Sequence, residues 1–413
     1  MSVSEIIDDS TIFGWHAPEI RKTPAAFRQV MRVAADNWQG RPLTVVLPSG
    51  HQVRLQGAPS LPEVRMIVRD FRFIRRILIS GDIGFAEGFI EGEWDSPDLS
   101  ALLEAFSHNF DRLAQLMTGN PFARAFSAVA HALNRNSRYG SRKNIHTHYD
   151  LGNAFYGLWL DPGMTYSAAR YADPGQTLEA AQTEKYAALA RAIELQPSHR
   201  LLEIGCGWGG FAEFVGKTIG AKVQAITISK AQYDYAQRRI FEQGLADRVE
   251  ISLKDYRDVD GAFDRIASIE MFEAVGEAYW PVYFKKIATL LRSGGRAGLQ
   301  IITIDENLFD GYRARPDFIQ RYIFPGGMLP SEPRLKVETQ AAGLTWSNVS
   351  HFALDYARTL DDWSQSFEAR WNEISELGFD ARFRRLWLYY LGYCEAGFRS
   401  GRTDVLQVAL TKG

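Results

Sequence analysis

A glycine-rich loop is the part of this sequence whose residue types and spacing first suggest chemistry. The run LLEIGCGWGGF (201–211) places an apolar strand pattern before Gly205, Gly207, Gly209 and Gly210, and a helix is expected to follow. Glycines at the end of a strand let the backbone approach a ligand closely, in the crevice at the carboxyl ends of an open α/β sheet. The loop therefore predicts a nucleotide-type cofactor site.

The spacing of the loop separates two classes of cofactor. A dinucleotide site needs G-x-G-x-x-G and an acidic residue about 20 positions later, which binds the ribose hydroxyls. Here the spacing is G-x-G-x-G-G, and the next predicted strand ends at Thr227, Ile228 and Ser229 without an acid. A dehydrogenase is therefore disfavoured. A nucleotide without a pyrophosphate fits better, and E-x-G-x-G after a first strand is typical of S-adenosylmethionine-dependent methyltransferases.

Alternating strands and helices must position this loop. The hydrophobic pattern predicts strands over 200–205, 223–229, 249–255, 263–271 and 296–304, and helices over 209–219, 229–245 and 278–291. Such alternation indicates βαβ units and a parallel sheet. Ser229 followed by Gln232 is a capping-box pattern, which begins the second helix. The last part predicts a strand over 344–352, two aromatic-rich helices over 359–399 and a final strand over 405–413.

The chain divides into an N-terminal domain over 1–110, a basic linker over 111–145 and a C-terminal domain over 146–413. In the first domain, 43–57 predicts a hairpin, and five arginines between 61 and 80 would form one charged, solvated stripe on a helix. No acidic residue lies between Asp111 and Asp150. This linker suits either an anionic membrane surface or a solvated connection. Its basic residues are Arg112, Arg124, Arg135, Arg138, Arg142 and Lys143.

Composition excludes several classes of protein. The 413 residues are 46% hydrophobic and 23% charged, which is globular composition, and Cys206 and Cys394 are too few for a disulfide framework or a thiolate metal site. A net charge of -2 gives no sign of nucleic-acid binding. The opening run does not resemble a signal peptide, and no apolar run approaches the ~20 residues that span a bilayer. We therefore expect a soluble, cytoplasmic protein.

Several longer motifs then identify a resemblance. The chain resembles the cyclopropane-fatty-acyl-phospholipid synthase family, which includes mycolic acid cyclopropane synthases and related fatty-acid methyltransferases. The motifs, in family order, are HYDLGNAFYGLWLDPGMTYS (148–167), LLEIGCGWGGFA (201–212), ITISKAQYDYA (226–236), SIEMFEAVG (268–276), RPDFIQRYIFPGGMLPS (315–331), DYARTLDDW (355–363) and YLGYCEAGFRSG (390–401). The resemblance implies an α/β fold, with a class I methyltransferase Rossmann-like sheet, helical lid insertions and a smaller N-terminal α+β domain that resembles a lipid-binding domain.

The resemblance also implies which residues bind S-adenosylmethionine. Positions that hold its methionine part are Tyr166, Ser167, Gly205, Gly207 and Gly209. Thr227 and Gln232 match the positions that face the ribose, and Asp255 and Tyr256 match the adenine contacts. Each polar side chain has the alternative of being a cap or turn residue; for Ser229 we adopt that alternative.

In the family the base is a bound bicarbonate, which a Glu, a His, a Tyr and backbone N–H groups hold. Glu273 and Tyr356 match the Glu and the Tyr, and Cys394 matches a cysteine near the site. Two positions depart from the family pattern: Gln300 replaces the His, and Ala168 replaces a Cys but keeps its backbone N–H. Gln300 can donate a hydrogen bond to an anion but cannot titrate.

Aromatic residues are expected to line the acyl chain, although ordinary core packing is the alternative for each one singly. These are Phe318, Tyr322 and Phe324 after the fifth strand, and Trp363, Phe367 and Trp371 at helical spacing. The expected reaction adds a methyl carbon to a cis double bond of a membrane phospholipid and closes a cyclopropane. C-methylation without ring closure and a non-catalytic lipid-binding homologue are the alternatives. A homodimer located peripherally at the inner face of the membrane is implied.

Overall fold

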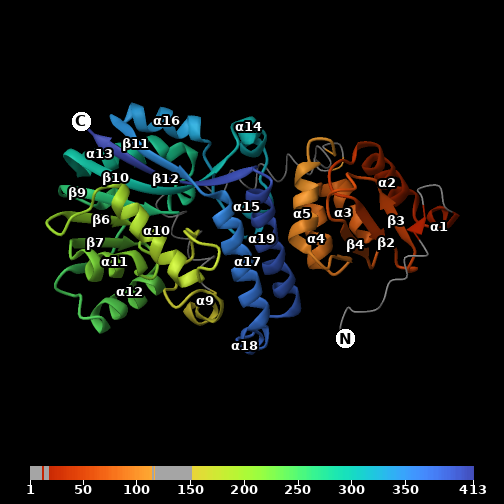
Figure 1. The fold of residues 1–413 in the computed structure, drawn as a ribbon, viewed down its shortest axis with the longest axis horizontal. Coiled ribbons are helices and arrows are strands. Elements are labelled where there is room, and N and C mark those ends of the chain that lie inside the picture. Colours follow the sequence, from red (N-terminus) through yellow and green to blue (C-terminus); the bar gives the residue numbers. More distant parts are fainter. Residues whose placement is uncertain (1–11, 14–17, 114–115, 117–150) are drawn as a thin grey trace. The chain divides into compact units, whose positions relative to one another are not determined.

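The structure is a computed structural model that describes residues 12–13, 18–113, 116 and 151–413 (Figure 1). Most of the predicted basic linker, including every basic residue after Arg112, lies outside these ranges. The described chain forms two units. One contains the residues up to 113 together with 379–400, and the other contains 151–378 together with 401–413.

The smaller unit combines a mixed sheet with helices. The sheet has the strand order β1-β3-β2-β4-β5, and β2 and β3 form the predicted antiparallel hairpin. Its strands are β1 (Ile12–Phe13), β2 (Leu43–Val46), β3 (Gln52–Leu55), β4 (Val64–Val68) and β5 (Trp94–Asp95). Its helices are α1 (Pro18–Arg21), α2 (Ala25–Asn37), α3 (Arg72–Ser80), α4 (Asp82–Ile90), α5 (Leu99–His108) and α19 (Ala381–Arg399).

The arginine-rich stretch between 61 and 80 is not one helix, so the single charged stripe is not formed. Its first half is strand β4, in which Val64, Met66 and Val68 are buried, and which pairs parallel with β2. Alternate burial is the period of a strand rather than of a helix. Only the second half, α3, is helical.

The larger unit is built on a seven-stranded sheet with the order β11-β12-β10-β9-β6-β7-β8. The pairs among β10, β9, β6, β7 and β8 are parallel, whereas β12 pairs antiparallel with both β10 and β11. The strands are β6 (Arg200–Ile204), β7 (Lys222–Thr227), β8 (Val249–Leu253), β9 (Phe263–Ile269), β10 (Leu291–Ile304), β11 (Leu344–His351) and β12 (Thr403–Lys412). The predicted strands and their parallel arrangement are confirmed.

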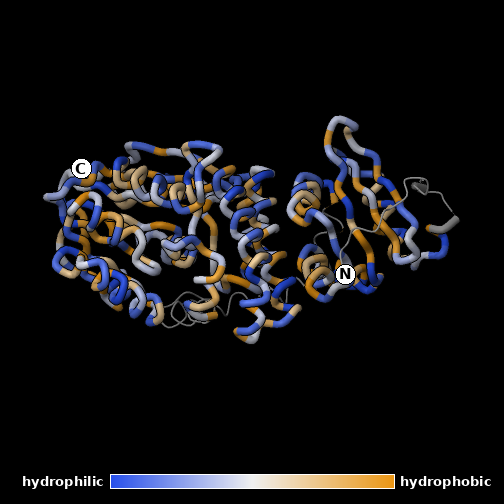
Figure 2. Tube along the Cα trace, turned by 60° about the horizontal axis from the view of Figure 1, so that its bottom comes forward, coloured by the Kyte–Doolittle hydropathy of each residue, from blue (hydrophilic) through white to orange (hydrophobic). Residues whose placement is uncertain are grey.

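Helices cover both faces of this sheet (Figure 1). Successive residues of a strand point to opposite faces. Accordingly, Leu201 packs in a core with α10 (Leu178–Ala192), α11 (Gly210–Phe214) and α12 (Lys230–Glu242), whereas Leu202 packs in a second core with α13 (Trp280–Leu290) and α16 (Glu332–Ala341). In Figure 2 the hydrophobic colour gathers inside the unit, and the outer helical turns are mostly hydrophilic. This is the doubly covered α/β sheet that the sequence predicts.

The remaining elements lie between and after the strands. They are α9 (Asn153–Trp159), the π-helix η2 (Val215–Ile219), the 3-10 turns η3 (Tyr256–Asp258), η4 (Phe272–Ala274) and η5 (Glu277–Tyr279), α14 (Glu306–Ala314), α15 (Phe318–Tyr322), α17 (Ala353–Ala369) and α18 (Trp371–Glu376). The predicted pair of helices over 359–399 is therefore three helices, α17, α18 and α19. Trp371 begins α18 and does not continue the α17 face, although its ring still lies 5.7 Å from that of Phe367.

Candidate active site

The glycine loop follows β6 with three glycines in the left-handed region. The φ angles of Gly205, Gly207 and Gly209 are 83°, 52° and 85°. A Cβ at Gly205 would lie 2.6 Å from the side chain of Met271, so this glycine permits close packing. A Cβ at Gly207 would meet nothing within 4 Å. The loop therefore presents bare backbone to open space at Gly207, as a cofactor cradle requires.

The chemistry around the loop also fits the sulfonium cofactor that the motif implies. Glu203, on β6, is buried, and its Oε2 has no hydrogen-bond partner among the described residues. Burial raises the pKa of this carboxyl to about 8. A buried polar atom without a partner is costly unless a ligand supplies one. Glu203 is the acidic residue of the E-x-G-x-G motif, and it was not among the predicted site residues.

The two residues expected at the ribose lie together at the end of β7. The hydroxyl of Thr227 donates to Oε1 of Gln232 at 3.0 Å, and both side chains are buried. The N–H of Ser229 donates to Thr227 Oγ1 at 3.1 Å, and the Ser229 side chain caps α12 through the N–H of Gln232. The interpretation of Ser229 as a cap is confirmed.

The predicted adenine contacts stand at the end of β8. Asp255 is buried, caps η3 through the N–H of Arg257, and binds the Arg257 guanidinium at 2.6 Å. The ring of Tyr256 packs edge-on against Tyr283, with centroids 5.3 Å apart. Arg257 is therefore an additional residue at this end of the site, and it holds the carboxylate of Asp255 in place.

A half-buried carboxylate at the end of β9 forms the most heavily bonded group of the site. Glu270 Oε2 accepts a 2.6 Å hydrogen bond from the Tyr356 hydroxyl. Its Oε1 accepts from Gln300 Nε2 at 2.7 Å and from the Ala168 N–H at 2.8 Å. Burial raises the pKa of Glu270, and the hydrogen bond from Tyr356 lowers it. Three predicted site residues therefore meet on a glutamate that was not predicted.

Glu273 has different surroundings. Its Oε1 accepts from the Ile302 N–H at 2.6 Å, and its Oε2 has no hydrogen-bond partner among the described residues. Burial, and then the negative charge of Glu270, raise the pKa of Glu273 to about 8. At neutral pH this side chain is therefore mainly a neutral acid. The structure brings Glu273 into the same region as Glu270 but not onto Tyr356 or Gln300.

Behind Glu270 lies a buried network that sequence reasoning also missed. Gln407 Nε2 donates to Gln300 Oε1 at 3.0 Å, because the two residues are register partners on β12 and β10. Lys185, on α10, is fully buried and donates from Nζ to the Ser167 hydroxyl at 2.7 Å. Burial lowers the pKa of Lys185 to about 7, and the charge of Glu270 opposes that shift. A lysine on a helix gives no signal in the sequence that it is buried.

Aromatic side chains surround Tyr166. Its ring centroid is 5.2 Å from that of Trp363 and 5.7 Å from that of Trp159. Trp363 and Phe367 are fully buried on α17, and Trp363 lies 6.3 Å from the ring of Tyr356. This aromatic group therefore extends from the predicted cofactor position to the partner of Glu270.

The second predicted aromatic group lies on and after α15. The rings of Phe318 and Tyr322 are 5.5 Å apart, and Phe324 follows directly. The Met328 N–H donates to the carbonyl of Glu273 at 2.9 Å, so this segment is attached near the end of β9. Cys394, the remaining predicted site residue, lies on α19, which belongs to the smaller unit.

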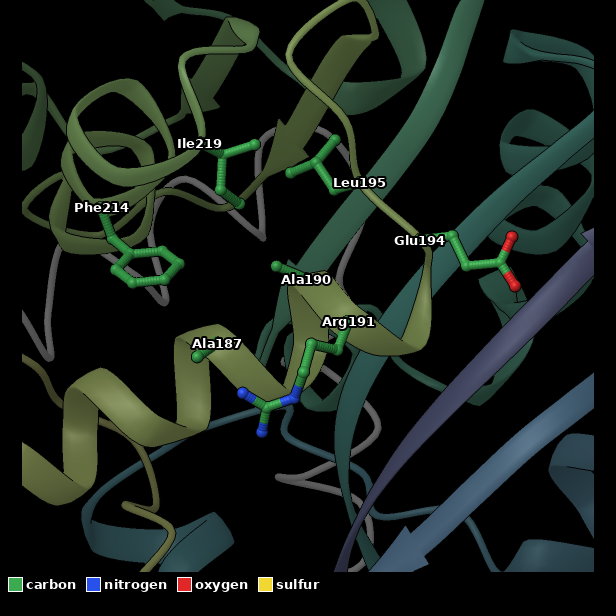
Figure 3. Close-up of a pocket in the computed structure, with 7 residues that line it drawn as sticks. All are labelled: Ala187, Ala190, Arg191, Glu194, Leu195, Phe214 and Ile219. Atoms are coloured by element: carbon green, nitrogen blue, oxygen red, sulfur yellow. The ribbon is translucent and has the colours of Figure 1, made fainter.

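One cavity of the larger unit is separate from these residues. It has a volume of about 240 Å³ and lies between α10 and the α11–η2 segment (Figure 3). Ala187 and Arg191 line it from α10, and Phe214 and Ile219 from the opposite side. None of its lining residues is a predicted site residue. The described ranges contain no cluster of His, Cys, Asp or Glu suited to a metal ion.

Comparisons with known proteins identify the family of the chain. The family model of mycolic acid cyclopropane synthetase matches residues 136–408. A tuberculostearic acid methyltransferase of Mycobacterium tuberculosis is 39% identical over 365 residues, which cover 86% of this chain and 84% of that protein. The cyclopropane-fatty-acyl-phospholipid synthase of Escherichia coli is 33% identical over 351 residues, with 84% and 87% covered.

A solved structure supports the same relationship. The crystal structure of a mycolic acid cyclopropane synthase complexed with SAH and CTAB superposes with a TM-score of 0.62 and 31% identity, covering 66% of this chain and 98% of that one. The sheet and its glycine loop are thus those of a class I methyltransferase. The chain belongs to the mycolic acid cyclopropane synthetase family of S-adenosylmethionine-dependent methyltransferases.

Proposed function

We propose that this protein transfers a methyl carbon from S-adenosylmethionine to the cis double bond of an unsaturated acyl chain in a membrane phospholipid, and that the product closes to a cyclopropane. The observation that carries this proposal is the packing of Tyr166 against Trp363, whose ring centroids are 5.2 Å apart. One residue is expected at the methyl donor and the other on the wall of the acyl chain. Their contact supports a site in which the double bond can meet the methyl group.

The residues of the chain have separable tasks in this proposal. The loop at Gly205–Gly209, together with Thr227 and Gln232, would hold the cofactor. When bound, S-adenosylmethionine supplies an electrophilic methyl group. Trp363 and Phe367 exclude water and other nucleophiles that would trap positive charge on the acyl chain. The faces of the aromatic rings also stabilise that charge.

A bound bicarbonate does not fit the residues present. The groups that the family resemblance assigns to it include the Tyr356 hydroxyl, the residue at 300 and the N–H at 168, and all three donate to Glu270 instead. A bicarbonate at the same three donors would lie directly beside the Glu270 carboxylate. The two negative charges would then repel each other. We therefore assign no step to bicarbonate.

C-methylation without ring closure is a second candidate. Of the relatives reported above, the tuberculostearic acid methyltransferase shares more identity with this chain than the cyclopropane synthase does, 39% against 33%. The products diverge only after methyl transfer: loss of a proton from a chain carbon gives a methylated alkene, and an internal hydride shift before proton loss places the double bond exocyclically. The same aromatic site and the same cofactor loop therefore suit either outcome.

The proposal places the protein peripherally on a membrane, at the inner face. Its support is α3 of the smaller unit, where Leu78 and Ile79 are 48% and 44% exposed and Arg72 and Arg75 are also exposed. Apolar and basic side chains on one short helix suit an anionic lipid surface. No helix in the described ranges is long and apolar enough to cross a membrane.

Mass spectrometry of lipids from cells that express the protein tests the proposed function. We expect monounsaturated phospholipid chains to gain the mass of one methylene group, and this gain to be absent in cells that express a Gly207→Val variant. Resistance of the product to mild hydrogenation distinguishes a ring from a methylated alkene. Unchanged lipids in cells that contain folded, cofactor-binding protein would contradict the proposal.

A further inference from the structure

Three hydrogen-bond donors from separate parts of the chain converge on the carboxylate of Glu270. Tyr356 comes from α17, Gln300 from β10 and the Ala168 N–H from the segment after α9, at 2.6, 2.7 and 2.8 Å. The N–H and NH₂ groups can only donate, and the hydroxyl donates here as well. Donors of this kind favour the charged form of a carboxyl group. The site is thus built to hold an anion.

The anion in this place belongs to the chain itself. A carboxylate and a bicarbonate share a planar group with two oxygens and one negative charge. The three donors expected around a bicarbonate are occupied by the side chain of Glu270, so the chain supplies the anion for which the family pattern calls. This also accounts for Gln300. A neutral amide is sufficient to bind the Glu270 carboxylate, because that carboxylate is part of the same chain and is already held in place.

The backbone at Glu270 is strained in a way that suits this role. Its φ angle is 48°, in the left-handed region that residues with a side chain seldom adopt. Such strain persists only where the surrounding structure over-determines it, and it is concentrated at functional sites. Here the strained turn at the end of β9 directs the side chain towards Tyr356 and Gln300, and so away from the position that Glu273 takes.

The charges around Glu270 suit a proton acceptor. Burial raises its pKa, which makes the carboxylate a stronger base, while the hydrogen bond from Tyr356 and the charge of protonated Lys185 act in the opposite direction. Lys185 itself donates to the hydroxyl of Ser167 at 2.7 Å. Each carboxylate oxygen has two acceptor sites, so Oε2 retains capacity beyond the bond from Tyr356.

We propose that Glu270 is the general base of this enzyme and replaces bicarbonate in the reaction. The inference rests on the proposed function. After methyl transfer the acyl chain is a carbocation. Glu270 takes a proton from the new methyl group, the electron pair of that C–H bond forms the second C–C bond of the ring, and the carboxyl later releases its proton to solvent. If the proton comes from a chain carbon, the electron pair of that C–H bond forms a double bond instead.

The test compares purified wild-type protein with E270Q, E270G and the control E242Q. Glu242 is exposed near the end of α12, so E242Q makes the same chemical change away from the site. Glycine at 270 relieves the positive φ and opens the space of the carboxylate. Substrate is supplied as vesicles of a monounsaturated phosphatidylglycerol, in buffer depleted of carbon dioxide, with and without added bicarbonate or formate.

We expect wild-type turnover to be indifferent to both anions. E270Q and E270G should lose at least ~100-fold in turnover, the lower range for a positioned acid–base group. Bicarbonate or formate should restore part of the activity of E270G but not of E270Q, whose amide still fills the space. Calorimetry should show S-adenosylmethionine affinity within about tenfold of wild type in every variant, and the thermal midpoint should show that each is folded.

Three results would overturn the inference: stimulation of the wild type by bicarbonate, turnover of E270Q within tenfold of the wild type, or an E270G variant that binds the cofactor and that neither anion restores. Failure of the proposed function is distinguishable from these. In that case the wild type binds S-adenosylmethionine but adds no carbon to the vesicle lipid under any condition, and the role of Glu270 as its base fails with it.

Discussion

The hydroxyl of Tyr356 lies 2.6 Å from Oε2 of Glu270, although the two residues are 86 positions apart in the sequence. This hydrogen bond connects α17, which also carries Trp363, to the end of β9. The proposed acyl-chain wall and the proposed base are therefore held by the same helix. Changes to Tyr356 should affect proton transfer more than cofactor binding.

Tyr356→Phe removes one donor from the Glu270 carboxylate. The remaining groups that face Glu270 are Lys185, Gln300, the Ala168 N–H and the neighbouring Glu273. Because a donor to the charged form is lost, the pKa of Glu270 rises, and a higher pH is needed to ionise it. We expect turnover at neutral pH to fall about tenfold or more, which corresponds to ~1.4 kcal/mol, and the acidic limb of the kcat–pH profile to move to higher pH.

Tyr171→Phe is the matched control, because the Tyr171 hydroxyl donates to a different carboxylate, that of Asp362, at 2.6 Å. This variant should keep the wild-type pH profile. An unshifted acidic limb in Tyr356→Phe would show that the hydrogen bond does not control ionisation of the base.

Glu273→Gln separates the two glutamates. Glutamine keeps an acceptor for the Ile302 N–H and resembles the neutral acid that Glu273 is at neutral pH. We expect turnover within about tenfold of the wild type, in contrast to E270Q. If Glu273→Gln loses more than a hundredfold and E270Q does not, Glu273 has the catalytic role that the family motif assigns to it.

The same variant should also change the pH dependence of stability. The pKa of Glu273 is about 8 in the folded protein, against a usual value of 4.5. Between these values the unfolded chain releases a proton that the folded chain keeps, so Glu273 lowers stability progressively as the pH rises. Glu273→Gln removes this effect. Its thermal midpoint, relative to the wild type, should therefore increase from pH 5 to pH 8; a constant difference would contradict the raised pKa.

Gly207→Val should abolish S-adenosylmethionine binding. The residue has a φ of 52°, which a β-branched side chain tolerates poorly, and the new side chain would project into the open space of the loop. Gly244→Val is a control, because Gly244 also has a positive φ of 66° and open space but lies beyond the end of α12. Calorimetry that finds equal affinity in both variants would remove the loop from the cofactor site.

Leu78→Asp should weaken association with anionic vesicles, because it places a negative charge on the exposed apolar side of α3. Association of the wild type should also weaken as salt rises past ~0.15 M, where the screening length is about 8 Å. Phe241→Asp, at a 76% exposed position on α12, is the matched control and should bind as the wild type does. Equal binding of the wild type to neutral vesicles would argue against an electrostatic membrane surface.

The sequence by itself determined the cofactor class, the parallel sheet and the family. These follow from local patterns: a glycine loop after an apolar strand, strands and helices in alternation, and motifs in order along the chain. Each depends on residues close together in sequence, so periodicity and spacing are sufficient. Between 61 and 80 such reasoning was wrong, because the arginines recur at helical spacing while Val64, Met66 and Val68 are buried alternately in β4.

Only the tertiary structure shows which glutamate accepts the hydrogen bonds of Tyr356, Gln300 and the Ala168 N–H. Glu270 and Glu273 stand three residues apart in one motif, and desolvation raises the pKa of both. Two features distinguish them: the backbone turn at Glu270, and the hydrogen bonds that Glu270 accepts from Tyr356 on α17 and Gln300 on β10. Hydrogen bonds between segments that are distant in sequence form only when the sheet and its helices have packed together. For the same reason, the burial of Lys185 beside Ser167 could not be predicted from a helix pattern.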